Sequence, residues 1–132
     1  MSNRRRTGYH NAYRSEFLRS PAWHARRDRW FNHRLRQPWP LICLGCGRCA
    51  VPAQLELHHL TYERVIQRAP GVWGAAEHHR DLIPLHPYCH ELLHRLIDRD
   101  AVLAKNRTRT VATTSALVRL RRALVDYGGQ HD

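Results

Sequence analysis

The sequence has no long apolar run, and this absence excludes the simplest membrane proteins. No segment approaches the roughly 18–20 consecutive apolar residues that a membrane-spanning helix needs. The N-terminus is rich in arginine and has no apolar segment behind it, unlike an export signal. The chain also contains no internal repeat. We therefore expect a soluble protein that stays in the cytoplasm and has no membrane partner.

Acidic residues and lysine are scarce, whereas arginine is abundant. The chain has 11 acidic and 22 basic residues, the formal net charge is +11, and the single lysine is Lys105. Ten of the arginines lie within residues 1–36, where only Glu16 and Asp28 oppose them. Arginine binds phosphates in a bidentate manner and stacks on bases, so the composition favours a nucleic-acid partner. A basic surface that serves solubility alone is the plainer interpretation.

A chain of 132 residues is long enough for one modest core and too short for two independent ones. The pattern predicts an α+β domain in three parts. Residues 1–19 form a basic arm, residues 20–97 form the core with its lead-in helix, and residues 98–132 form a linker and a last helix. Phosphate contacts are expected from three adjacent arginines of the arm. These are Arg4, Arg5 and Arg6.

A helix is predicted from Pro21 to about Arg36. Ser20 followed by Pro21 provides the preferred cap and the preferred first residue of a helix. Its apolar side chains recur at near-helical spacing, and the aromatic ones are expected in the core rather than stacked on a ligand. The apolar residues are Trp23, Trp30 and Leu35, with Phe31 beside them. The opposite side of this helix is expected to present Arg26, Arg29 and Arg36 to nucleic acid.

Two short strands and a second helix are predicted in the middle of the chain. Residues 54–61 alternate in polarity, and residues 81–85 form a short apolar run, so each is expected to form a strand. The segment between them, residues 64–80, contains a Pro-Gly pair and is interpreted as a loop. A helix should begin at Pro87, directly after the second strand.

A last helix is predicted near the C-terminus. Thr114 or Ser115 can cap its first turn, and the Gly128-Gly129 pair is expected to end it. A leucine stripe would face the core, with arginines mostly outside it. The stripe consists of Leu117, Leu120 and Leu124.

Cysteine spacing predicts a structural metal site. Cys43 and Cys46 form one x2 pair, and His86 and Cys89 form a second. Three thiolates and one imidazole match a closed tetrahedral zinc site. Cys49 lies three residues after Cys46 and offers the same spacing, but Gly47 directly after Cys46 favours the earlier pair. Four unligated buried cysteines are the alternative.

A second metal site is predicted from the histidines. His90 and His94 are four residues apart on a helix, so both rings lie on one face and can share one ion. His58 and His59 are adjacent on a strand, where neighbouring side chains point to opposite faces. We therefore expect two different roles for the pair: one ring binds the metal, and the other moves a proton.

The same residues carry a resemblance to the HNH endonucleases, a family built on a ββα-metal core. The similar segments are CLGCG, LELHHLTYE, RDLIPLH and CHELLH, and the helix after Ser20 resembles the lead-in of small phage and bacterial members. The resemblance implies a ββα-metal core with a zinc knuckle, flanked by an N-terminal and a C-terminal helix. It further implies that His59 is the general base and that His58, His90 and His94 hold a catalytic divalent ion.

Two positions depart from the family pattern, and the first is His86, which stands where a zinc-binding cysteine is usual. Asp81 stands where the family has an asparagine that holds the base histidine in place. A carboxylate can accept a hydrogen bond from an imidazole N–H as an amide oxygen can, and it would raise the pKa of that histidine. Asp81 is therefore expected to position His59, and the plainer interpretation is a solvated acid at the start of a strand.

The resemblance implies a phosphodiester hydrolase that acts on double-stranded DNA in the cytoplasm of a bacterial or phage-infected cell. It would use one structural Zn²⁺ and one catalytic divalent ion, which the ligands allow to be Mg²⁺, Mn²⁺, Ni²⁺ or Zn²⁺. One alternative is a non-catalytic DNA-binding module that keeps only the zinc. Another is an accessory nuclease that acts with a phage packaging, recombination or restriction partner.

Overall fold

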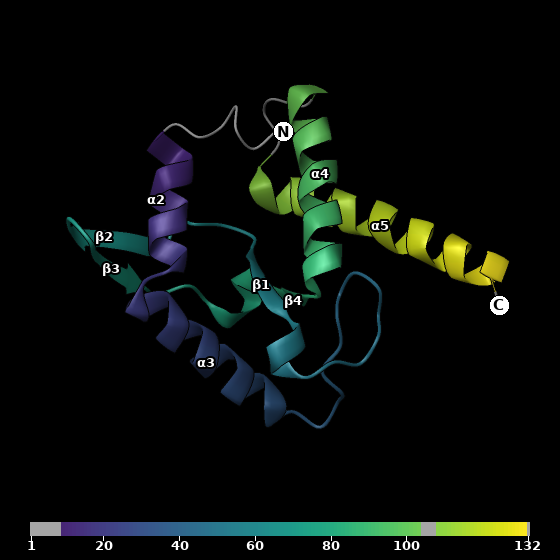
Figure 1. The fold of residues 1–132 in the computed structure, drawn as a ribbon, viewed down its shortest axis with the longest axis horizontal. Helices are drawn as coiled ribbons and strands as arrows, with labels where there is room; N and C mark the ends of the chain where they lie inside the picture. The colour runs from purple at the N-terminus through teal and green to yellow at the C-terminus, as the bar shows by residue number, and fades with distance from the viewer. Residues whose placement is uncertain (1–8, 104–107, 132) are drawn as a thin grey trace. The chain divides into compact units, whose positions relative to one another are not determined.

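The computed structural model describes the backbone of residues 9–103 and 108–131, with side chains over residues 14–99 and 108–124. Within these residues the fold is α+β, with four α-helices and two small antiparallel sheets of two strands each (Figure 1). The predicted phosphate contacts of the arm lie outside the described residues; these are Arg4, Arg5 and Arg6.

The chain divides into two compact units. Unit 1 consists of residues 1–36 and 62–78, and unit 2 consists of residues 37–61 and 79–132. The chain therefore leaves unit 2 after the first of that unit's two strands, contributes residues 62–78 to unit 1, and returns to unit 2 before the second strand. None of the described helices is both long and apolar enough to cross a membrane.

Unit 1 begins with two helices, α2 (Tyr9–Leu18) and α3 (Pro21–Leu35). Helix α2 occupies part of the stretch for which the sequence suggested only a basic arm. Helix α3 begins as predicted: Ser20 is its N-cap, and the Ser20 side chain accepts a hydrogen bond from the Trp23 N–H at 3.2 Å. The aromatic side chains of Trp23, Trp30 and Phe31 are buried as expected, whereas Leu35 is 55% exposed.

Arg26 does not face solvent, so its prediction as a nucleic-acid contact is wrong. It lies three residues after Trp23 and four before Trp30, which puts it on the buried side of α3. Its side chain is 4% exposed, and its Nε and Nη2 donate to the carbonyl oxygen of Glu77 at 3.0 and 2.7 Å. Arg29 is exposed as expected.

The segment interpreted as a loop contains a hairpin formed by β2 (Val65–Ala69) and β3 (Val72–Ala75). Pro70 and Gly71 make its two-residue turn, in which Gly71 has a φ of +74°. That conformation strains residues with a side chain, which explains the glycine. Trp73 anchors the hairpin, because its ring packs against Phe17 with a centroid separation of 5.7 Å.

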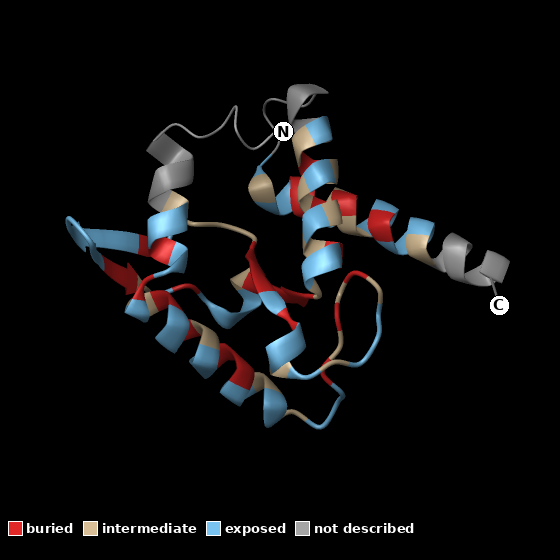
Figure 2. Cartoon of the chain, in the orientation of Figure 1, coloured by how far each residue is buried: buried red, intermediate tan, exposed pale blue. Residues whose placement is uncertain are grey.

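Unit 2 contains a sheet and two helices in the order strand, strand, helix, helix. Strand β1 (Glu56–His59) pairs antiparallel with β4 (Leu82–Leu85), and α4 (Pro87–Leu103) follows directly. The register places His58 opposite Ile83 and His59 opposite Leu82. Both strands are buried along most of their length (Figure 2). The predicted strands and the predicted start of α4 are confirmed.

The last helix, α5 (Arg109–His131), is longer than predicted at both ends. It begins before the expected caps, with the Thr108 hydroxyl accepting a hydrogen bond from the Val111 N–H at 3.1 Å. It also continues through Gly128 and Gly129, so the expectation that they end it is wrong. Among its described side chains the buried ones are Ala112, Thr113, Ala116 and Leu120, so Leu120 is buried as predicted and Leu117 and Leu124 are only half-buried.

Candidate metal centres

The first cluster brings together the two predicted x2 pairs. One potential ligand atom from each of Cys43, Cys46, His86 and Cys89 lies within 4.8 Å of all the others. A tetrahedral zinc site with Zn–S bonds near 2.3 Å has ligand atoms about 3.7 Å apart, so the four side chains fit such an ion with small adjustments. The cluster could hold a metal such as zinc.

Local backbone geometry explains why the first pair converges. Gly47 follows Cys46 with a φ of +79°, which reverses the chain after the second thiol. Gly45, between the two cysteines, has no room for a side chain, because a Cβ there would lie 2.8 Å from the Cβ of Cys89. The alternative ligand Cys49 is exposed and lies outside the cluster. The cluster that could hold a metal therefore includes Cys43 and leaves out Cys49.

The Cys43 sulfur lies in an environment that favours a thiolate. Burial opposes its charge, but three backbone N–H groups point at Sγ: those of Gly45 at 3.3 Å, Cys46 at 3.5 Å and His86 at 3.3 Å. These donors outweigh burial and lower the pKa of Cys43 below its ordinary value. Burial and the neighbouring sulfurs raise the pKa of Cys89 to about 12. A cation at the cluster would offset the repulsion between neighbouring thiolates that raises the pKa of Cys89.

The second cluster consists of three histidines from β1 and α4. The Nδ1 of His58 lies 3.2 Å from the Nε2 of His90, and the Nε2 of His94 lies 3.0 Å from the same atom. A tetrahedral ion with bonds of 2.0–2.1 Å separates its nitrogen ligands by about 3.3 Å. The two measured separations are close to this value, and all three nitrogens lie within 4.8 Å of one another, so His58, His90 and His94 could hold one metal ion.

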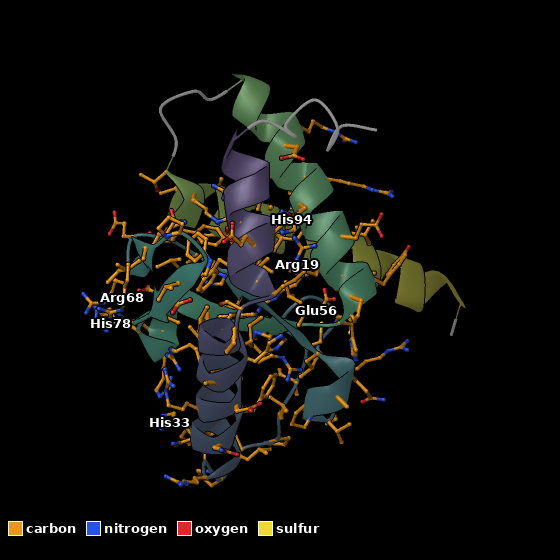
Figure 3. The ribbon with its side chains drawn as sticks, turned by 60° about the vertical axis from the view of Figure 1, so that its left-hand side comes forward. Arg19, His33, Glu56, Arg68, His78 and His94 are labelled. Atoms are coloured by element: carbon orange, nitrogen blue, oxygen red, sulfur yellow. The ribbon has the colours of Figure 1, made fainter. Side chains whose placement is uncertain are left out.

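The other nitrogens of two of these rings have partners of their own. The Nε2 of His58 lies 3.0 Å from the Thr113 hydroxyl oxygen of α5, and the Nδ1 of His90 lies 2.9 Å from a carboxylate oxygen of Glu56. Glu56 comes from β1 and His94 from α4 (Figure 3). Such outer contacts fix the tautomer and orientation of metal-binding histidines, so this arrangement suits metal binding better than a simple histidine cluster.

Burial keeps His58 neutral. Its side chain is 1% exposed, and burial lowers its pKa well below the ordinary value, with Arg109 and the neighbouring histidines adding to the effect. A neutral imidazole carries one proton on one of its two ring nitrogens. If that proton lies on the other nitrogen, the nitrogen that would bind the ion is already unprotonated. The His90 side chain is 19% exposed, which leaves the cluster open to solvent on that side.

The predicted base and its predicted positioning residue lie beside this cluster. His59 is 1% exposed, belongs to neither cluster, and accepts a hydrogen bond at its backbone oxygen from Arg109 Nε at 2.7 Å. Asp81 is half-buried at the end of the 3₁₀ helix His79–Asp81. Its backbone oxygen accepts from the Leu60 N–H at 2.8 Å, one residue beyond His59. Both residues therefore lie at the same end of the β1–β4 ladder.

Sequence reasoning missed Glu56 and Thr113. The signal for Glu56 was available, because it lies two residues before His58 on a strand and so shares its face. Thr113 had no local signal, since its partner is 55 residues away. Comparisons with family models, with curated proteins and with solved structures find no match to this chain.

Proposed function

We propose that this chain is a metal-dependent endonuclease of the HNH type, which hydrolyses phosphodiester bonds in DNA. The observation that supports the proposal most is the convergence of three histidines: His58 Nδ1 and His94 Nε2 lie 3.2 and 3.0 Å from His90 Nε2. The three rings come from β1 and from α4, the helix that directly follows β4, the strand paired with β1, and this matches the ββα order of the family that the sequence resembles.

A divalent ion bound there would act as a Lewis acid on the scissile phosphate and on the leaving oxygen. In this proposal His59 takes a proton from water, and the water oxygen forms a bond to phosphorus. The bond between phosphorus and the 3′ oxygen breaks, and that oxygen takes up a proton. The products are a 5′-phosphate and a 3′-hydroxyl, as the family resemblance implies.

The charge of the chain supports DNA as the substrate. The net charge is +11, and exposed arginines lie on α3 at Arg29 and on the outer side of α5. Those of α5 are Arg119, Arg121 and Arg122. Such side chains neutralise phosphates without reading sequence.

The direct test is nicking of supercoiled plasmid by the full chain with Mg²⁺, Mn²⁺, Ni²⁺ or Zn²⁺. We expect cleavage with at least one ion and a loss of about 10²- to 10⁴-fold in rate for His59→Ala, the range for removal of a general base. His33→Ala provides a matched control, because His33 is an exposed histidine of α3 outside both clusters. Undiminished cleavage by His59→Ala would remove the proposed base.

One observation favours a second candidate, a non-catalytic DNA-binding module that keeps the zinc cluster. The His59 side chain is 1% exposed, and a general base must reach both water and the scissile phosphate. This module would bind plasmid DNA with the salt dependence of phosphate contacts, and it would leave supercoiled plasmid intact with every ion tested. Nicking that disappears in His59→Ala excludes it.

A further inference from the structure

We propose that Thr113 is a positioning residue, which selects Nδ1 of His58 as the atom that binds the ion. The inference rests on the proposed second metal site, and it assigns a role to α5, an element outside the ββα core. Thr113 does not touch the ion in this proposal. It acts through the ring of His58, by holding the nitrogen that faces away from His90.

The burial of Thr113 sets it apart from its neighbours on α5. Its side chain is 0% exposed, and it is the polar member of a buried stripe whose other described members are Ala112, Ala116 and Leu120. A buried hydroxyl needs a hydrogen-bond partner. The adjacent Thr114 is exposed, and its Oγ1 donates within the helix to the Thr110 carbonyl at 2.9 Å. The Thr113 hydroxyl lies instead 3.0 Å from His58 Nε2.

Two further contacts hold the start of α5 against the end of β1. Arg109 Nε donates to the carbonyl oxygen of His59 at 2.7 Å, and the Thr110 hydroxyl donates to the carbonyl oxygen of Leu60 at 3.2 Å. The first turn of α5 is thereby fixed along the residues that follow His58. This fixed register places the Thr113 hydroxyl opposite Nε2 of His58.

The contact determines which tautomer of His58 is available for metal binding. With an ion at Nδ1, the proton lies on Nε2, and Nε2–H donates to Thr113 Oγ1. If the hydroxyl is removed, this buried N–H loses its partner in the metal-bound form, which makes that form less favourable. Removal should therefore weaken metal binding without touching any ligand.

The test compares Thr113→Val, which keeps the shape and removes the hydroxyl, with Thr113→Ser, which keeps the hydroxyl. Thr114→Val is the matched control at the exposed neighbouring position. Each full-length variant, loaded with one equivalent of Zn²⁺, is titrated calorimetrically with Ni²⁺ as the probe. We expect the Kd for Ni²⁺ to rise about 10- to 100-fold in Thr113→Val and to stay near the wild-type value in the other two.

A second measurement on the wild-type chain does not depend on any variant folding. Long-range ¹⁵N NMR correlations of His58, recorded with Zn²⁺ added to both clusters, should show a protonated Nε2 and a metal-bound Nδ1. Metal at Nε2, or an unchanged Kd in Thr113→Val, would overturn the assignment of Thr113 alone. Wild-type protein that binds no second divalent ion would overturn the metal site itself and the proposed function with it.

Discussion

Replacement of Gly45 by alanine should disturb the cluster of Cys43, Cys46, His86 and Cys89, which could hold zinc, from a position that is not a ligand. A Cβ at residue 45 would lie 2.8 Å from the Cβ of Cys89, and 3.2 Å from both the Sγ of Cys89 and a methyl carbon of Leu120. Ordinary contact begins at 3.4 Å, so the backbone of one partner must shift by about 0.6 Å to relieve the closest approach. Because Cys89 is a predicted ligand, this shift acts directly on the cluster.

The cost of such overpacking is about 1–3 kcal/mol. Folding of a small zinc site and binding of its ion are coupled, so the cost should appear as a zinc affinity reduced by roughly 5- to 150-fold. Competition against a chromophoric chelator measures that affinity. Charge-transfer absorption after Co²⁺ replaces the ion reports whether the thiolates still bind.

Gly71→Ala serves as the control for this substitution. Gly71 has a φ of +74° and lies in the β2–β3 turn of unit 1, so alanine strains the backbone there without approaching any cysteine. Its zinc affinity should equal that of the wild type. If Gly45→Ala also binds zinc as tightly as the wild type, the close approach of Gly45 to Cys89 is wrong.

Three further predictions concern zinc stoichiometry, pH and helix capping. Elemental analysis should find one tightly bound zinc per chain in Cys49→Ser and none in Cys46→Ser. The reverse result would make Cys49 the zinc ligand in place of Cys46. Because the pKa of His58 is lowered in the folded state, protons bind the unfolded chain preferentially below pH 6.5. The free energy of unfolding should therefore fall with decreasing pH by up to about 1.4 kcal/mol per pH unit. Urea titrations at several pH values measure it. The prediction is contradicted if the wild type shows no such fall, or if His58→Gln shows the same fall. Ser20→Ala should lower the free energy of unfolding by about 1 kcal/mol in urea, and no loss would contradict its role as the cap of α3.

The elements that carry the site could be predicted because their signals are local. Ser20 and Pro21 specify the start of α3 within one turn, and the spacing of His90 and His94 places both rings on one face of α4 whatever surrounds that helix. The Cys43 and Cys46 spacing likewise closes within a single turn of the backbone. In each case the residues that set the geometry are within four positions of one another.

The remaining features depend on contacts between distant segments. The partner of Thr113 is set by the register of α5 against β1, which no short stretch of sequence encodes. Arg26 had a helical spacing that indicated burial, but its charge suggested exposure, and the acceptor that satisfies it is 51 residues away. The hairpin at Pro70 was detectable from its Pro-Gly pair, which marks two-residue turns as well as loops.

The convergence of three imidazoles on one ion is tested most directly by metal uptake. Chain that already holds one zinc is titrated with Ni²⁺, and X-ray absorption then gives the ligands of the bound nickel. We predict one Ni²⁺ per chain with three imidazole ligands, and binding at least about tenfold weaker in His94→Ala but unchanged in the exposed His33→Ala. A chain that binds no Ni²⁺, or whose affinity is the same in His94→Ala, would contradict the second metal site.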